Sequence, residues 1–434
     1  MSVAQSSPPR GGRPRALPFP GDLVLTPVSR RPTRLEDSTL RTILDRPVPA
    51  VPVGSPTQPE ASVVVVTRDN LAFLRLCLES VLAATAVPFE LIVVDNGSRD
   101  GTQDYLVRLA ERNRNVRAVF NGSNRGFAAA CNQGASVAGG HILVLLNDDT
   151  VVTHGWLRRL AAHLERPRVG MAGATTNRTG NEAQIDVDYR TWGELVRFAD
   201  ARGRHHEGKA FEIPTLTMFC LAMRRGLYEQ VGPLDERFET GLLEDDDYSR
   251  RVRDAGYRLL CADDAFVHHF GETSFGKLVP SGEYAHVLEA NRARFESKWD
   301  ETWRPYKRRH SARYKELSER MRRAVVDAVP ADATVLVVSR GDDELLQVGD
   351  RRMWHFPRGD DGAYAGHHPA DSDEAIARLE TQRAAGAEYI VFPDTATWWL
   401  EHYEGLRRHL DVRYPRVYSD PDTGVIFDLR RDPQ

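Results

Sequence analysis

The sequence predicts an α/β protein in which a larger domain with a mostly parallel sheet precedes a smaller α/β domain. Three observations lead to this prediction. Apolar runs rich in β-branched residues alternate with segments of helical periodicity. Acidic and polar residues follow several of these runs directly. A second, shorter series of strands and helices fills the end of the chain.

Four apolar runs predict the first strands of the larger sheet, at residues 62–67, 89–95, 116–121 and 141–149. Segments with helical spacing lie between them, at residues 71–81, 102–111 and 128–138. A continuous apolar run is typical of a strand that is buried on both faces of a parallel sheet. Ligands of such sheets bind beyond the carboxyl ends of the strands. We therefore expect the functional residues immediately after the apolar runs.

The remaining segments differ in composition. Residues 1–59 are rich in Pro, Arg and Ser, which predicts disorder with a short ordered piece near residues 35–44. Residues 60–304 form the predicted larger domain. Residues 305–330 read as a charged amphipathic helix, which either packs on its neighbours or contacts anionic lipid or a partner. Residues 331–434 form the predicted small α/β domain, with strands at 334–339, 388–393 and 424–429 and helices at 373–385 and 395–410.

Composition narrows the class of protein. The net charge of −4 gives no indication of a nucleic-acid partner. The four cysteines are far apart and form no CxxC pair, which argues against a disulfide framework or a thiolate metal site. No apolar run reaches the roughly 20 residues that span a bilayer, and no secretory signal opens the chain. We expect a cytoplasmic protein, or one at the inner face of the cell membrane.

Two acidic motifs follow predicted strands. Asp95 ends one strand, where its carboxylate could accept hydrogen bonds from a ribose or a base, or simply cap a helix. Asn147, Asp148 and Asp149 end another. Adjacent carboxylates repel each other, and Mn²⁺ or Mg²⁺, which prefer oxygen ligands and substrate phosphates, would relieve that repulsion. The alternative for this motif is an ordinary polar turn.

Two further motifs lie later in the larger domain. Residues 244–247 are four consecutive acids at the start of a predicted helix, more than helix capping requires, so one of them is a candidate general base. His268 and His269 end another apolar run. Adjacent residues of a strand point to opposite faces, so at most one of the two can be a metal ligand.

Together these motifs resemble glycosyltransferase family 2, over about residues 62–299. The segment VVDNGSRDGT, which contains Asp95, is close to the family's nucleotide-binding segment. Residues 124–152 resemble the block that ends in its DXD-type metal motif. Residues 233–259 resemble its catalytic segment and VHHFGETSF its terminal histidine segment. The resemblance implies a Rossmann-like GT-A fold and a cell-surface polysaccharide or O-antigen type of glycosyltransferase.

The resemblance also implies residue roles. Asp245 is the expected general base, and Asp149 and His269 are the expected metal ligands, with His268 as the alternative histidine. The expected donor-binding residues are Thr67, Asp69, Asp95, Asn124, Gly126, Asn147 and Asp148. Two departures stand out: Asn147 replaces the first Asp of the DXD motif, and Asp69 stands where many members have Asn.

The implied reaction is a metal-dependent, inverting transfer from a UDP- or dTDP-sugar to a hydroxyl of a saccharide or lipid-linked saccharide. The stretch between residues 170 and 241 is expected to form the acceptor side. A sugar nucleotidyltransferase is the first alternative, but it would need a glycine-rich phosphate loop after the first strand, where TRDNLAF stands. A non-catalytic nucleotide-sugar-binding or scaffold protein is the second, and the presence of Asp149, Asp245 and His269 argues against it.

Overall fold

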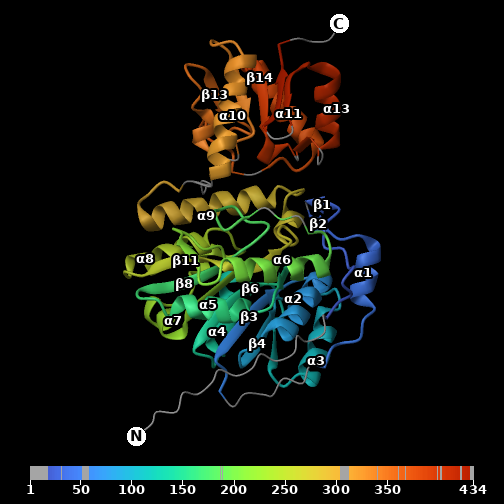
Figure 1. Ribbon diagram of the computed structural model, residues 1–434, viewed down its shortest axis with the longest axis vertical. Helices are drawn as coiled ribbons and strands as arrows, with labels where there is room; N and C mark the ends of the chain where they lie inside the picture. Colours follow the sequence, from blue (N-terminus) through green and yellow to red (C-terminus); the bar gives the residue numbers. More distant parts are fainter. Residues whose placement is uncertain are drawn as a thin grey trace.

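The structure is a computed structural model that describes residues 18–430 except 31, 51–57, 186, 188, 304–311, 340, 360, 367, 398, 401–402 and 421–422. Figure 1 shows a large unit with helices on both faces of a central sheet, and a smaller unit beyond helix α9. None of the described helices combines the length and the apolar character needed to cross a bilayer.

The central sheet of the large unit has nine strands, eight of them in the order β5-β4-β3-β6-β10-β8-β11-β7, with β9 paired to β11. Parallel pairing joins β5, β4, β3 and β6, whereas β10 runs antiparallel between β6 and β8. The predicted α/β class with a mostly parallel sheet is therefore confirmed. The strands are β3 (Ala61–Thr67), β4 (Phe89–Asp95), β5 (Val116–Phe120), β6 (Ile142–Asn147), β7 (Thr150–Val152), β8 (Val169–Thr175), β9 (Ala210–Glu212), β10 (Cys220–Arg224) and β11 (Arg258–His269).

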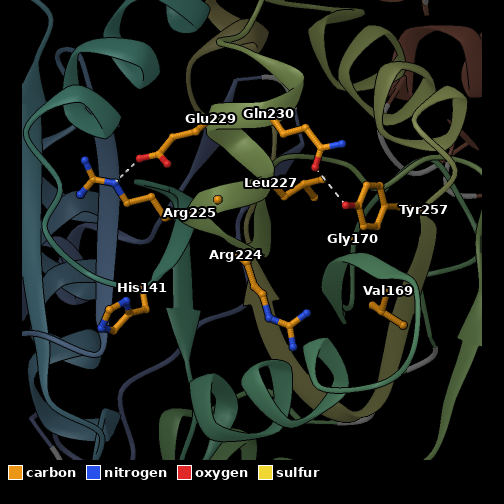
Figure 2. A pocket seen from close by; sticks show the side chains of 10 residues that line it. His141, Val169, Gly170, Arg224, Arg225, Leu227, Glu229, Gln230 and Tyr257 are labelled. Atoms are coloured by element: carbon orange, nitrogen blue, oxygen red, sulfur yellow. Dashed lines mark hydrogen bonds and ion pairs between the residues drawn. The ribbon is translucent and has the colours of Figure 1, made fainter.

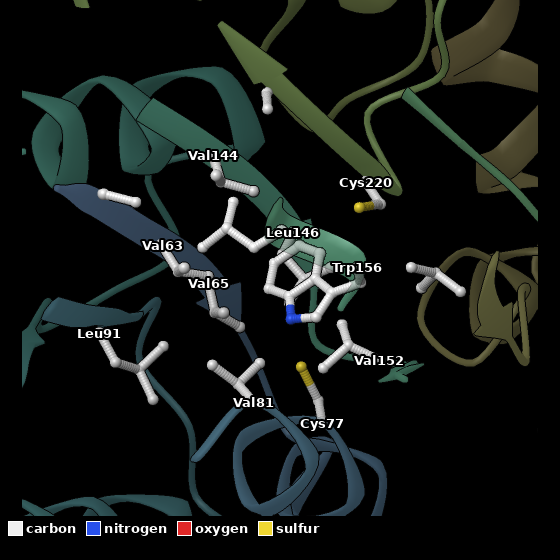
Figure 3. Close-up of a cluster of buried hydrophobic side chains, with 14 of the residues drawn as sticks. Val63, Val65, Cys77, Val81, Leu91, Val144, Leu146, Val152, Trp156 and Cys220 are labelled. Atoms are coloured by element: carbon white, nitrogen blue, oxygen red, sulfur yellow. The ribbon is translucent and has the colours of Figure 1, made fainter. Parts of the chain in front are cut away.

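Helices cover both faces of this sheet. On one face, Trp156 lies at the centre of a core with Cys77, Val65, Leu146 and Val152 (Figure 3). On the other face, the strands pack against α4, α7 and α8. Burial on both faces explains why the strands read as continuous apolar runs. The helices are α2 (Leu71–Ala84), α3 (Thr102–Arg112), α4 (Phe127–Ser136), α5 (Trp156–Leu164), α6 (Trp192–His205), α7 (Arg225–Val231), α8 (Glu244–Asp254) and α9 (Glu283–Trp299).

The N-terminal segment corrects one prediction. In place of disorder over residues 1–59, the described part from residue 18 to residue 50 packs on the large unit through a buried apolar cluster that includes Phe19, Leu25 and Ile43. It contains β1 (Ser29–Arg30), β2 (Thr33–Arg34) and α1 (Asp37–Leu44), which agrees with the expected ordered piece. Buried Arg75 donates hydrogen bonds to the backbone carbonyls of Leu44 and Arg46, 2.9 Å each. Residues 1–17, 31 and 51–57 lie outside the described residues.

The smaller unit has a five-stranded sheet in the order β13-β12-β14-β16-β15. Helix α10 (Ala312–Ala328) packs on one face of it through Met321 and Val325, so the predicted connecting helix belongs to this unit and packs on its neighbours. The predicted boundary at residues 304 and 305 is not fully described. The other elements are β12 (Thr334–Val337), β13 (Arg352–His355), α11 (Ser372–Ala384), β14 (Tyr389–Pro393), α13 (Glu404–Arg413), β15 (Arg416–Asp420) and β16 (Gly424–Asp428).

Candidate active site

Two adjacent carboxylates lie in the turn between β6 and β7, next to the carboxyl end of β3. Asp148 and Asp149 are 7% and 5% exposed. The hydroxyl of Thr67, the last residue of β3, donates to Asp148 Oδ2 at 2.7 Å. The amide of Asn70 donates to Asp148 Oδ1 at 3.1 Å and to the hydroxyl of Thr273 at 3.2 Å, and that hydroxyl donates to Asp149 Oδ2 at 2.9 Å. One continuous hydrogen-bonded chain therefore holds both carboxylates.

His269, at the end of β11, lies next to the second carboxylate oxygen of Asp149, Oδ1. The imidazole Nε2 lies 3.2 Å from Asp149 Oδ1. On the other side of the ring, Nδ1 lies 2.8 Å from the carbonyl oxygen of Arg178, so Nδ1 carries the proton and donates it there. The ring of Phe219 stacks on the imidazole at 5.2 Å with an interplanar angle of 16°. The orientation of His269 is thus set by contacts on three sides.

His268 points away from these carboxylates, as expected for the neighbouring residue of a strand. Its Nδ1 lies 2.7 Å from the hydroxyl of Tyr189, and its ring packs edge-on against Phe270. Burial, and then the neighbouring His269, lower the pKa of His268 to about 3. His268 is therefore a neutral core residue, and His269 is the histidine that faces Asp149.

The pKa values of the two carboxylates, Asp148 and Asp149, are shifted in opposite directions. Burial, and then the charge of Asp149, raise the pKa of Asp148 to about 7. Burial would also raise the pKa of Asp149, but His269 and the Thr273 hydroxyl outweigh burial and hold that pKa below its usual range. Asp149 is therefore the carboxylate that carries the negative charge. No group of three His, Cys, Asp or Glu side chains within the described ranges is arranged to hold a metal ion alone.

The four consecutive acids form the first turn of α8, behind a strained loop. Leu242 and Leu243 both have left-handed backbone conformations, with φ of 76° and 72°. Such conformations are costly for non-glycine residues and persist only where the surroundings enforce them. Here buried Asn291 of α9 donates hydrogen bonds to the carbonyls of Gly241 at 2.6 Å and Leu242 at 3.0 Å. Helix α9 therefore positions the start of α8.

The four acids are not equivalent. Burial, and then Asp245, raise the pKa of Asp246 to about 8, and the same causes raise the pKa of Glu244 well above its usual range. Burial raises the pKa of Asp245 only to about 6. Asp247 has a structural role, because its carboxylate forms ion pairs with Lys298 at 2.6 Å and with Arg251 at 3.1 Å. Of Glu244, Asp245 and Asp246, Asp245 is the first to ionise near neutral pH.

Several contacts connect the acid turn to the Asp149–His269 pair. The hydroxyl of Thr215 lies 3.4 Å from Asp246 Oδ1, and the Thr217 hydroxyl lies 3.0 Å from that of Thr179. Thr179 directly follows Arg178, whose carbonyl orients His269. The segment that leads into β10 therefore contacts both the acid turn and the stretch that orients His269.

The predicted donor-binding residues have structural partners of their own. Asp95 is fully buried and accepts hydrogen bonds from the Ser98 amide at 3.2 Å and from Gln103 at 2.8 Å. Asp69, with a φ of 49°, accepts a hydrogen bond from the Arg99 amide at 2.7 Å. The Asp69 bond connects the loop after β3 to the loop after β4, in which the Asp95 bonds lie, so the two loops that hold Asp69 and Asp95 are hydrogen-bonded to each other.

The loop before α4 is similarly fixed. The carbonyl oxygen of the Asn124 side chain accepts hydrogen bonds from Asn96 at 2.8 Å and from the Gly126 amide at 3.1 Å. Gly126 has a φ of 86°, and a Cβ atom there would lie 1.7 Å from the carbonyl oxygen of Glu239. Only glycine fits at this contact between α4 and the loop that leads to the acid turn. Asn147 ends β6 beside Val66 of β3.

Comparison with known proteins identifies the fold around these residues. Residues 62–232 match the family model described as Glycosyl transferase family 2. This part of the chain is therefore similar to glycosyltransferase family 2. The match covers β3 to α7, and therefore includes Thr67, Asp95 and Asp149, whereas the acid turn and His269 follow it in the sequence.

Three curated relatives are similar to part of this chain. Protein y4gI of Sinorhizobium fredii, which is uncharacterised, is 30% identical over 234 residues, which cover 50% of this chain and 25% of y4gI. Glycosyltransferase AglE of Haloferax volcanii is 27% identical over 50% of this chain and 70% of AglE. The O-antigen biosynthesis protein RfbC of Myxococcus xanthus is 27% identical over 57% of this chain and 20% of RfbC. The chain thus spans only a quarter or less of the length of two of these three relatives.

Several residues of the candidate site were not predicted from the sequence. Asn70, Asn177, Thr273 and Asn291 are short polar residues to which the motifs assigned no role, and each acts through partners far along the chain. Arg178 contributes only its carbonyl to His269. Asn177 and Arg178 belong to the stretch expected on the acceptor side, and in the structure they support the histidine.

A separate cavity of about 500 Å³ lies at the opposite edge of the sheet (Figure 2). It is lined by residues at the start of β8 and β11 and at the end of β10, including Val169, Arg224 and Tyr257. The Tyr257 hydroxyl donates to Gln230 at 3.0 Å, and Arg225 pairs with Glu229 at 3.0 Å. None of the predicted site residues lines this cavity, so it is distinct from the candidate active site.

Proposed function

We propose that this chain is a metal-dependent, inverting glycosyltransferase. It would transfer a sugar from a UDP- or dTDP-sugar to a hydroxyl of a saccharide or lipid-linked saccharide in the synthesis of a cell-surface glycan. The names of AglE as a glycosyltransferase and of RfbC as an O-antigen biosynthesis protein support the class of reaction and the class of product. The proposed location, the cytoplasm or the inner face of the membrane, rests on the sequence.

The Asp149–His269 pair carries the metal part of the proposal. Because Nδ1 of His269 donates to the Arg178 carbonyl, its Nε2 faces Asp149 Oδ1, 3.2 Å away, with either a proton or a lone pair. Two electron-pair donors at this distance repel each other unless a proton or a cation lies between them. A carboxylate and an imidazole suit Mn²⁺, and such ions commonly take their remaining ligands from substrate phosphates. Asp149 and His269 would hold Mn²⁺ or Mg²⁺, which would neutralise the charge of the departing nucleoside diphosphate.

Asp245 is the proposed general base. It would accept the proton of the acceptor hydroxyl while that oxygen attacks the anomeric carbon from the face opposite the leaving group, which inverts the configuration. Its pKa, about 6, leaves it ionised at neutral pH while Glu244 and Asp246 stay largely protonated. The strained loop held by Asn291 would fix the direction in which this carboxylate points.

The donor nucleoside would lie along the loop pair that follows β3 and β4. Thr67, Asp69 and Asp95 would line one side of it, and Asn124, Gly126 and Asn147 the other. Asp148 would support the site through Thr67 and Asn70. Thermal-shift measurements with UDP-, dTDP- and GDP-sugars plus Mn²⁺ test this part, since a ligand at a hundred times its dissociation constant stabilises the native state by about 2.7 kcal/mol.

The decisive test of the mechanism is Asp245→Asn, which keeps the shape and removes the proton acceptor. Transfer should fall by a factor on the order of 10²–10⁴, while donor and metal binding survive. Asp247→Asn is the matched control, because Asp247 is bound to Lys298 and Arg251 and its loss should reduce stability more than turnover. If Asp245→Asn transfers sugar at the wild-type rate, the proposed base is wrong.

A further inference from the structure

A hydrogen-bonded Ser–His–Asp chain lies in the smaller unit, far along the sequence from the proposed sugar-transfer site. Ser339 follows β12 and His355 ends β13, and these two strands are parallel neighbours. The Ser339 hydroxyl lies 2.6 Å from Nδ1 of His355, and Nε2 of His355 lies 3.2 Å from Oδ1 of Asp343. The carboxyl ends of parallel strands are where α/β sheets collect their ligands.

The Asp343 carboxylate at one end determines which atom donates each hydrogen bond along Ser339, His355 and Asp343. A carboxylate can only accept, so the neutral imidazole donates Nε2–H to Asp343 and presents the lone pair of Nδ1 to Ser339. The Ser339 hydroxyl therefore donates its proton to His355. The amide of Gly341 donates to the Ser339 oxygen at 3.3 Å, which leaves the hydroxyl proton free for the imidazole. This is the order of a nucleophile, its base and the group that orients the base.

The surroundings suit a neutral imidazole that can take up a proton. Ser339 and His355 are 4% and 6% exposed, whereas the Asp343 side chain is 50% exposed. Burial is the main cause that lowers the pKa of His355, although Asp343 opposes it. The turn around Gly341 is closed by backbone, since the Asp342 amide donates to the Ser339 carbonyl at 3.1 Å. The turn therefore does not require the hydroxyl–imidazole contact.

We propose that Ser339, His355 and Asp343 form a second active site, which cleaves or transfers the acyl group of small carboxylic esters. Because Ser339 is buried, small esters such as acetates are the substrates to test first. This activity is independent of the sugar transfer proposed for the large unit.

In the first step the Ser339 oxygen attacks the ester carbonyl carbon, and its proton passes to Nδ1 of His355. The bond between the carbonyl carbon and the alcohol oxygen breaks, and the departing alcohol takes the proton from His355. Water then attacks the acyl-serine, with His355 again accepting and returning the proton, and releases the carboxylic acid. Asp343 holds Nε2–H throughout and stabilises the imidazolium.

The test uses the full-length protein with 4-nitrophenyl acetate and with a fluorophosphonate probe located by mass spectrometry. The wild type should carry the probe on Ser339 and release nitrophenol. Ser339→Ala and His355→Gln should lose the label, and hydrolysis should fall by a factor on the order of 10²–10⁴. His409→Gln is the matched control: its imidazole also pairs with a carboxylate, Glu380 at 2.7 Å, and it should leave labelling unchanged.

Asp343→Asn is a second variant that should fold normally, because the Asp343 side chain is half exposed and its replacement leaves the core intact. It should slow hydrolysis while the melting temperature stays near that of the wild type. A wild-type protein without label on Ser339, or a folded Ser339→Ala protein that hydrolyses the ester as fast as the wild type, overturns the proposal. Sugar transfer by Ser339→Ala should equal that of the wild type, so the outcomes for the two sites are separable.

Discussion

Replacing Ile43 by alanine should destabilise the large unit, although Ile43 precedes the family match. Ile43 lies in α1, is completely buried and belongs to the cluster that joins Phe19 and Leu25 to Phe73 and Trp192. Its neighbour Leu44, in the same helix, is 42% exposed. The pair thus offers a buried and an exposed aliphatic residue one position apart.

The size of the effect follows from the burial. Truncation of a buried isoleucine to alanine removes the transfer free energy of the lost carbons and leaves a cavity, about 2–5 kcal/mol together. An exposed aliphatic residue such as Leu44 costs within about 0.5 kcal/mol. In a domain of this size one kcal/mol shifts the melting temperature by roughly 2–4 °C. Ile43→Ala should therefore lower the melting temperature by about 4–20 °C, and Leu44→Ala by about 2 °C or less.

Calorimetry of the two variants and the wild type measures this difference. The unfolding transition of the large unit is recognised as the one that shifts to higher temperature when a donor nucleotide-sugar is added. Equal melting temperatures for Ile43→Ala and the wild type would refute the reasoning, since they would show that α1 does not pack on the large unit in solution. A shift as large for Leu44→Ala as for Ile43→Ala would show that the loss of stability does not follow burial, because alanine is itself a good helix former.

Three further predictions concern the proposed sugar-transfer site. Asp149→Ala should remove the Mn²⁺ dependence of nucleotide-sugar binding, and calorimetry with and without a chelator checks this; a variant that still binds more tightly with Mn²⁺ contradicts the metal role. Asn291→Ala leaves two carbonyls without a buried donor, at a cost of about 1–3 kcal/mol; steady-state kinetics should show a lower kcat with little change in the KM of the donor. The transfer rate should fall as the pH drops through about 6, because Asp245 must be ionised to accept a proton; a pH–rate profile that is flat from pH 5 to 8 would contradict this.

The parts of the molecule that could be predicted share a physical property. The strands β3, β4 and β6 are buried on both faces, so their sequence alone shows them, and the acids that follow β6 do lie at its carboxyl end. The opposite directions of His268 and His269 follow from the geometry of a strand. Local periodicity and local geometry are sufficient for features of this kind.

The parts that escaped prediction depend on distant partners. The N-terminal segment has the composition of a disordered chain, yet its carbonyls are held by Arg75, some thirty positions later. Asn291 holds the acid loop across about fifty positions. The sequence also does not show that the Asp95 carboxylate accepts hydrogen bonds from nearby residues, because its donors Ser98 and Gln103 are ordinary turn and helix residues.

The contact at Gly126 limits how this protein could be re-engineered. The missing Cβ atom allows the loop before α4 and the carbonyl of Glu239 to touch, so neither backbone can shift without the other. Grafting the stretch that precedes α8 from a relative, in order to change the proposed acceptor preference, would therefore also disturb the loop proposed to bind the donor unless both were exchanged together. Recombination between family members should succeed more often when its crossovers keep residues 124–127 and 233–243 from the same parent.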